Sequence, residues 1–186
     1  IDVHCHLDFY SEDKIKEIIS NAKKADVKKI ITAGVSSKTN KLSLEISEKY
    51  PEVFPSLGIY PIDAISMSDQ EVKKEIQFIR NNKEKIVAIG EIGLDLKEDS
   101  ENMEKQKKVF RQLIELSIEI KKPVIVHSRK AEKECIEILE EYHSAKVIMH
   151  CFSGSKILIE RAADNKFCFS IPSIIRHSEH FQSLVN

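Results

Sequence analysis

Two histidines, His4 and His6, flank a cysteine in the apolar run IDVHCHLD that opens the chain. Side chains alternate across a β-strand, so the two imidazoles point the same way with their Cβ atoms roughly 7 Å apart. Imidazole nitrogens bind divalent metals at about 2.0 to 2.1 Å, and two of them on one face can converge on one ion. Two core histidines satisfied by hydrogen bonds would give the same pattern, so this motif alone leaves both interpretations open.

Three more side chains of this kind follow apolar runs elsewhere in the chain. Glu91 ends the run VAIGE, His127 ends PVIVH and His150 ends VIMH. A buried ionised carboxylate without a partner is costly, and several imidazoles around it are readily explained by a bound cation. A polar network without metal is the alternative. We therefore predict a metal site built from His4, His6, Glu91, His127 and His150. Mixed nitrogen and oxygen ligands suit zinc, manganese or magnesium.

Such a site needs a scaffold that brings the ends of several strands together. Short apolar runs alternate with longer amphipathic ones along the whole chain, which predicts an α/β fold with a parallel sheet covered on both faces. The five glycines all lie at or just past the end of a predicted strand. That carboxyl rim is where α/β proteins build active sites. The predicted strands cover residues 1–6, 29–33, 53–59, 86–94, 123–127, 146–151 and 167–171.

Composition sets the outer limits of the interpretation. The chain has 186 residues, of which 41% are hydrophobic and 32% charged, as in an ordinary globular domain. The net charge of -1 gives no overall basic field, so a polyanionic substrate must be met by local charge, metal or backbone amides. No apolar run approaches the roughly 18 to 20 residues of a membrane helix, and no protein partner is evident. Four well-separated cysteines predict reduced thiols in a cytoplasmic protein.

The motifs as a set resemble the TatD family of metal-dependent hydrolases, in the amidohydrolase-like branch of TIM barrels. Four strand ends match the family in order: IDVHCHLD, VAIGEIGLD, PVIVHSR and VIMHCFSG. The resemblance covers 1–186 and implies a (β/α)8 barrel that holds two divalent ions. It also implies that His4 and His6 hold one ion, that His127 and His150 hold the other, and that Glu91 bridges them.

Loops over the predicted site depart from the family pattern. Tyr60 and Ile62 stand where members often have histidines, Lys130 where an aspartate is common, and Leu96 where an aromatic is common. These residues bear on substrate preference rather than on metal chemistry.

The resemblance implies a deoxyribonuclease that trims DNA from the 3′ end. Paired divalent cations can clamp a phosphodiester and supply hydroxide at neutral pH, with Glu91 as the catalytic residue that holds both ions. Arg129 is predicted to hold a phosphate oxygen bidentately, with Lys130 assisting; a solvated loop charge is the alternative for Arg129. Tyr60 or Phe152 is predicted to stack on a base, although core packing is an equal alternative for Phe152.

Two other functions stay open at this point. A metal-dependent amidohydrolase, such as a deacylase or lactonase, uses the same barrel and similar ligands, although many carry a carbamylated lysine where this chain has Glu91. The family's last ligand, an aspartate on strand eight, has no counterpart here. We therefore expect 1–186 to be a single barrel domain that is C-terminally incomplete, with strand eight missing and an open edge beside His4 and His6. An inactive truncated barrel is accordingly the second alternative.

Overall fold

Seven β-strands alternate with helices along the chain, as the apolar runs predict. A computed structural model describes residues 1–185 of the protein. The strands form one sheet in the order β1-β2-β3-β4-β5-β6-β7, and each neighbouring pair is parallel. Their bounds are β1 (Asp2–Cys5), β2 (Ile30–Gly34), β3 (Val53–Leu57), β4 (Ala88–Gly93), β5 (Val124–His127), β6 (Val147–His150) and β7 (Cys168–Ser170).

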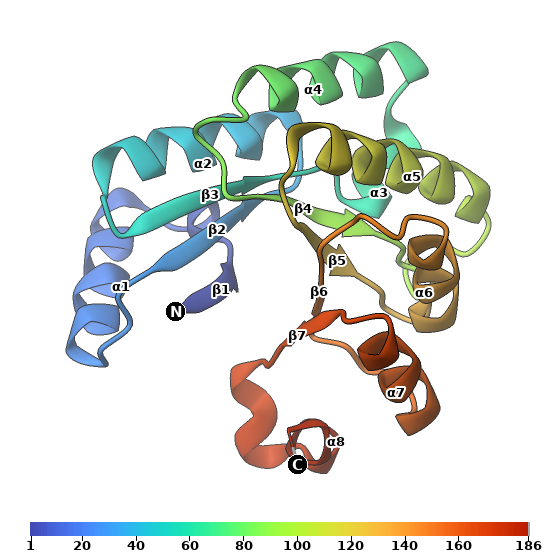
Figure 1. Ribbon diagram of the computed structural model, residues 1–186. Helices are drawn as coiled ribbons and strands as arrows, with labels where there is room; N and C mark the ends of the chain where they lie inside the picture. The colour runs from blue at the N-terminus through green and yellow to red at the C-terminus, as the bar shows by residue number, and fades with distance from the viewer. Residues whose placement is uncertain (186) are drawn as a thin grey trace.

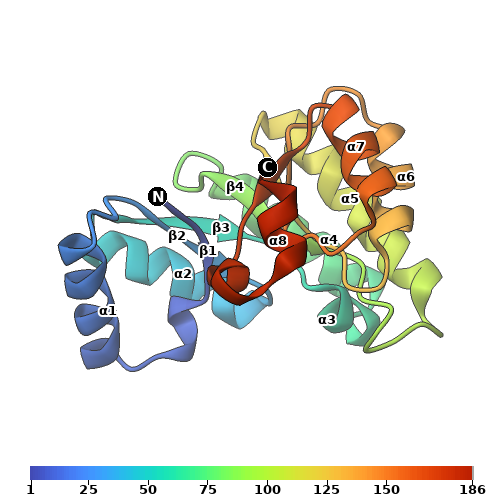
Figure 2. The ribbon, with the colours of Figure 1, turned by 90° about the horizontal axis from the view of Figure 1, so that it is seen from below.

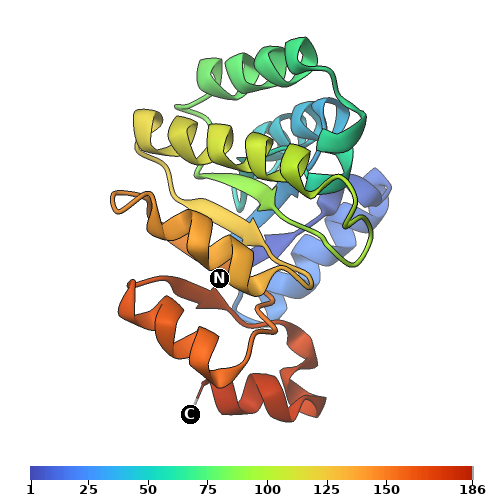
Figure 3. The ribbon, with the colours of Figure 1, turned by 90° about the vertical axis from the view of Figure 1, so that its right-hand side faces the viewer.

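Helices cover the outer side of this sheet. The α-helices are α1 (Glu12–Lys24), α2 (Ser37–Lys49), α3 (Pro61–Ser66), α4 (Asp69–Asn81), α5 (Met103–Ile120), α6 (Glu132–Glu140), α7 (Lys156–Asp164) and α8 (Glu179–Leu184), with short 3-10 helices η1 (Leu7–Phe9) and η2 (Ser173–His177). The sheet curls into a nearly closed barrel with the helices outside it (Figure 1). Figure 3 shows α4, α5, α6 and α7 following one another down the outer side. The predicted TIM-type fold is confirmed, with seven strands present.

The two ends of the sheet leave the barrel open on one side. Among residues 1–185, β1 pairs only with β2, and β7 pairs only with β6. A cavity of about 580 Å³ is lined by residues from both free edges, including Val3 and Phe169. Helix α8 and η2 lie between the α1–α2 side and the α6–α7 side of the molecule (Figure 2). His180 of α8 donates a hydrogen bond from Nε2 to the Phe152 carbonyl at 3.0 Å.

Side-chain caps define where several helices begin. Ser36 before α2 and Ser68 before α4 each form a capping box, in which the serine hydroxyl and the residue three positions later satisfy each other's backbone N–H. Ser11 occupies the N-cap of α1, but its hydroxyl makes no capping hydrogen bond. Helix α4 is therefore fixed at its start by local contacts that α1 lacks.

The core lies between the central strands and the helices outside them. All six residues of β4 are buried, and so are the first three residues of β5. The large cluster around them includes Leu57, Ile89, Phe110 and Val126, whereas a second, smaller cluster lies under β1 and α1. The ends of β4 and β5 are thus the parts of the rim that packing holds most firmly.

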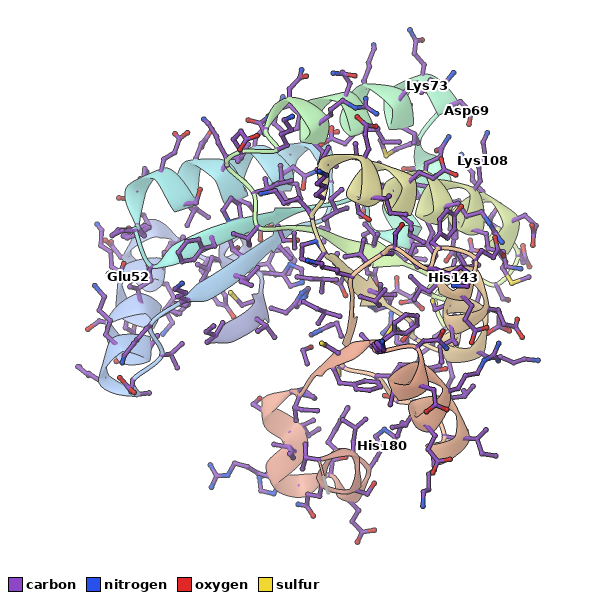
Figure 4. All side chains as sticks on the ribbon, in the orientation of Figure 1. Glu52, Asp69, Lys73, Lys108, His143 and His180 are labelled. Carbon is purple, nitrogen blue, oxygen red and sulfur yellow. The ribbon has the colours of Figure 1, made fainter. Side chains whose placement is uncertain are left out.

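Charged side chains cover the outer faces of the helices (Figure 4). Lys108 of α5 donates to both carboxylate oxygens of Asp69 at the start of α4, at 2.8 and 2.7 Å, and both residues are labelled in Figure 4. Such exposed pairs contribute little to stability, so the packing beneath them determines how the helices sit. No helix in the described part of the chain is long and apolar enough to cross a membrane.

Candidate active site

A cavity of about 620 Å³ opens at the carboxyl rim of the barrel. The five predicted metal ligands and both predicted cations line it: His4, His6, Glu91, His127, His150, Arg129 and Lys130. They come from the ends of β1, β4, β5 and β6 and from the loops that follow. Parallel pairing places these carboxyl ends at one level, which is why residues so far apart in sequence meet here.

Glu91 lies at the centre of the group and is 4% exposed. Its Oε2 lies 3.4 Å from Nε2 of His4 and 3.4 Å from Nε2 of His6. The two histidine nitrogens are 3.2 Å apart. Donors bound to one ion at about 2.0 to 2.1 Å and at tetrahedral angles are roughly 3.4 Å from each other. The three atoms are therefore spaced as three ligands of a single ion would be.

The other carboxylate oxygen of Glu91 faces a different histidine. Its Oε1 lies 2.8 Å from Nδ1 of His127. The two oxygens of one buried carboxylate thus point to two separate imidazole groups, one at the end of β1 and one at the end of β5. This is the arrangement that a carboxylate shared between two ions requires.

Hydrogen bonds outside the cavity orient two of the imidazoles. Nδ1 of His6 donates to the carbonyl oxygen of Ala33 at 3.0 Å, which leaves Nε2 as the nitrogen with a lone pair. Nδ1 of His150 lies 3.0 Å from the Ser170 hydroxyl. Backbone and hydroxyl partners of this kind commonly orient metal-ligating histidines.

His4 lies closer to His150 than the family pairing implies. Their rings are stacked with centroids 3.8 Å apart, and His4, Glu91 and His150 offer ligand atoms that all lie within 4.8 Å of one another. His4 Nδ1 is buried and has no hydrogen-bond partner within residues 1–185. Because several imidazoles and one carboxylate converge around an unsatisfied buried nitrogen, the donor set fits divalent metal ions.

Burial and mutual contact shift the pKa values of the group. Burial raises the pKa of the Glu91 carboxyl, but hydrogen bonds from three histidines, His127 foremost, outweigh it and hold that pKa well below its usual range. Burial, and then the nearby His4, lowers the pKa of His150 to about 4. At neutral pH the carboxylate is therefore ionised and His150 is neutral, and these are the protonation states that metal binding requires.

Arg129 and Lys130 reach the cavity in different ways. Nε and Nη2 of Arg129 donate to Oδ2 of Asp95 at 2.8 and 2.7 Å, and Nη2 also pairs with Glu98. Within residues 1–185 the structure gives Nη1 of Arg129 no partner, so its N–H groups are free for a ligand. Lys130 is exposed at the rim.

The two predicted stacking aromatics are both engaged elsewhere. The Tyr60 hydroxyl donates to Oδ2 of Asp95 at 2.8 Å and lies 3.3 Å from Nε2 of His127, and Tyr60 lies outside the lining of the cavity. Phe152 is 1% exposed and packs against Phe169 with ring centroids 5.6 Å apart. For Phe152 the packing alternative is correct, because a ring so buried cannot meet a base.

Asp95 is a residue next to the candidate site that the sequence interpretation missed. It is fully buried, and side chains from three separate segments converge on it: Tyr60, His127 and Arg129. The only signal in the sequence is a carboxylate inside the apolar run IGLDL, four positions after Glu91. Its partners lie tens of residues away along the chain, so spacing could not pair them with it.

Comparison with known proteins defines the class to which the chain belongs. An uncharacterised metal-dependent hydrolase of Methanocaldococcus jannaschii is 33% identical over 186 residues, which are 100% of this chain and 72% of that protein. The human deoxyribonuclease TATDN3 is 32% identical over 197 residues, covering 100% of this chain and 72% of its own length. The barrel, the cavity and these relatives together define a metal-dependent hydrolase.

Family and structure comparisons narrow this class. The family model described as TatD related DNase matches residues 1–186. The crystal structure of YjjV, a TatD homologue from Escherichia coli K12, superposes with a TM-score of 0.88 at 28% identity, over 99% of this chain and 73% of that one. A TatD family hydrolase of Entamoeba histolytica shares the fold, with a TM-score of 0.85 over 98% of this chain and 68% of that one, at 22% identity. The chain belongs to the TatD family.

Proposed function

We propose that this chain is a divalent-metal-dependent phosphodiester hydrolase that cleaves DNA, removing nucleotides from the 3′ end. The observation that carries the proposal is that the two carboxylate oxygens of Glu91 face different histidines. Oε2 faces His4 and His6, whereas Oε1 faces His127. A second support is that a relative of 32% identity is named a deoxyribonuclease.

In this proposal two ions occupy the cavity. His4 and His6 would hold one, His127 and His150 would hold the other, and Glu91 would be shared by both. Zinc, manganese and magnesium all suit mixed nitrogen and oxygen ligands, and four imidazoles favour the transition metals. When bound, such ions stabilise the negative charge of a reacting phosphodiester and lower the pKa of water so that it can attack.

In this proposal the cationic side chains of Arg129 and Lys130 bind the phosphates of the substrate. Arg129 is held by Asp95 on one side of its guanidinium, so the unpaired Nη1 can donate to a phosphate oxygen without further reorganisation. Lys130 adds a mobile charge at the rim, where a second phosphate would pass. Tyr60 contributes by fixing Asp95 and His127 rather than by touching a base.

The dimensions of the cavity favour attack at a chain end. A volume of about 620 Å³ lies in the range of small-molecule sites and takes a ligand the size of about one or two nucleotides. The net charge of -1 gives no overall basic field that would attract a long duplex. A terminal nucleotide entering the rim is the substrate that agrees with both observations.

The rest of the proposal follows the same interpretation. We propose that residues 1–186 form one hydrolase domain; no protein partner is evident in the sequence, and the cytoplasmic location stays a prediction from cysteine spacing.

The test is a panel of substrates with and without EDTA. Single-stranded DNA labelled at its 5′ end should shorten progressively from the 3′ end in the presence of Mn²⁺ or Mg²⁺, and EDTA should abolish the reaction. Glu91→Gln should lose at least about 100-fold in rate, whereas Glu84→Gln, an exposed carboxylate before β4, should retain it.

Other substrates decide between the alternatives. A chromogenic ester and a D-aminoacyl substrate test the amidohydrolase function. Cleavage of these with DNA left intact would overturn the proposal in favour of that class. No turnover of any substrate by metal-loaded protein would favour an inactive barrel.

A further inference from the structure

Asp95 joins the two halves of the proposed active site. It lies two residues after β4 ends, and its side chain is fully buried. Its Oδ1 accepts hydrogen bonds from the backbone N–H groups of Lys97 and Glu98, at 3.1 and 3.0 Å. These two bonds fix the rotation of the carboxylate, so that Oδ2 faces His127 and Arg129.

That second oxygen receives three side chains. Oδ2 lies 2.9 Å from Nε2 of His127, accepts from the Tyr60 hydroxyl at 2.8 Å and accepts from Nε of Arg129 at 2.8 Å. Oδ2 of Asp95 therefore contacts both His127, from the proposed metal site, and Arg129, from the proposed phosphate site.

The contact with Asp95 determines which nitrogen of the His127 ring keeps its hydrogen when a metal binds. An ionised carboxylate can only accept, so Nε2 of His127 must carry a hydrogen. Nδ1 lies 2.8 Å from the Glu91 carboxylate and donates its own hydrogen to it in the metal-free chain, so Nδ1 is the nitrogen whose hydrogen a bound ion would replace. A carboxylate behind a histidine in this way sets its tautomer and makes it a stronger ligand.

We propose that Asp95 is a positioning residue that holds His127 in the tautomer with Nδ1 available to metal and holds Arg129 with Nη1 available to substrate. This inference rests on the proposed function, because it assigns a role at the same site. It adds a prediction that the function alone does not make, namely that one buried carboxylate controls both metal affinity and substrate binding.

Asp95→Asn is the variant that isolates this role. Asparagine keeps the size of the side chain and an oxygen for the backbone amides of Lys97 and Glu98. Its NH2 group then faces Nε2 of His127 and the guanidinium of Arg129. Because all three groups are hydrogen-bond donors, the contacts that Asp95 accepts are lost. His127 is driven to carry its hydrogen on Nδ1, the atom that would bind the ion.

Glu98→Gln is the matched control, because Glu98 contacts Arg129 but not His127. Its side chain is about half exposed, so the substitution leaves no buried group unsatisfied. Zinc binding to both variants and to the unmodified chain is measured by calorimetric titration, with circular dichroism to verify folding.

We expect the two variants to differ in their affinity for zinc. Asp95→Asn weakens zinc binding at one of two sites by about 10- to 100-fold, and Glu98→Gln leaves both sites unchanged. With single-stranded DNA, both variants raise KM, but only Asp95→Asn also lowers kcat at fixed, subsaturating zinc. Asp95→Asn that binds two zinc ions with the affinity of the unmodified chain would overturn the inference.

A measurement on the unmodified chain keeps the inference testable if Asp95→Asn does not fold. Nitrogen-15 spectra of the zinc-loaded protein should show the His127 hydrogen on Nε2, and a hydrogen on Nδ1 would contradict the role. The two proposals can also fail separately. Zinc binding that shows the expected difference between the variants, in a protein that leaves DNA intact, supports the positioning role and refutes the nuclease function. The reverse outcome, DNA cleavage with no such difference, refutes the positioning role alone.

Discussion

The centre of the sheet and its two free edges contribute to the same site under very different constraints. Glu91 and His127 lie at the ends of β4 and β5, where the strands are buried almost throughout. His4 lies in β1, in which no residue is fully buried, and His6 directly follows that strand. His150 ends β6 and is held through Ser170 of the short strand β7.

This contrast indicates how the site is assembled. The central ligands are positioned by packing before any ion arrives, whereas the ligands near the edges are positioned by few contacts of their own. A cation shared by both groups would therefore join the first strand to the middle of the sheet. Stability and metal binding should respond differently to changes in the two regions.

The largest difference should appear when the core of each region is truncated. Ile89→Ala in β4 removes a fully buried side chain and should lower the free energy of unfolding by about 2 to 5 kcal/mol. Val3→Ala in β1 removes a partly exposed side chain and should cost about 1 kcal/mol or less. Urea unfolding of both variants measures this. Equal losses would show that the edge strand is as well packed as the centre.

Metal should stabilise the protein by connecting the two regions. Zinc at 100 times its dissociation constant should raise the free energy of unfolding by about 2.7 kcal/mol for each site, and EDTA should reverse the effect. The gain should disappear in Glu91→Gln, since that residue contacts histidines of both regions. Thermal melts at several zinc concentrations provide the measurement; a melting temperature independent of zinc would contradict a link through metal.

The smallest effect concerns the helices beside each region. Ser68→Ala should destabilise the protein by about 1 kcal/mol, because its hydroxyl caps α4. Ser11→Ala should cost only a few tenths of a kcal/mol, because its hydroxyl makes no capping bond to α1. Denaturant midpoints of the two variants, measured side by side, test the difference. A larger loss for Ser11→Ala would mean that α1 is capped in solution.

Much of the fold could be predicted because the strands are apolar and the helices amphipathic. Each predicted strand overlaps an observed one, and ends such as His127 and His150 fall at the rim because polar residues interrupt the apolar runs there. The same logic identified Glu91, since a carboxylate that ends an apolar strand needs a partner.

Contacts made across the barrel could not be predicted in this way. The stacking of His4 on His150 depends on how far the sheet curls, which no local pattern encodes. The pairing of Arg129 with Asp95 joins two loops, and sequence spacing gives no reason to pair them. Tyr60 was predicted to stack on a nucleic-acid base because it is aromatic, but in the structure its hydroxyl donates a hydrogen bond to Asp95.

A zinc titration of three matched variants decides whether Glu91 joins the two regions. Glu91→Gln should weaken binding at both metal sites, His150→Asn mainly at one, and Glu84→Gln at neither. Calorimetry with elemental analysis gives the affinity and the number of ions per chain. Two zinc ions bound to Glu91→Gln as tightly as to the unmodified chain would contradict the bridging role, and Glu91 would then be a partner that only orients a histidine.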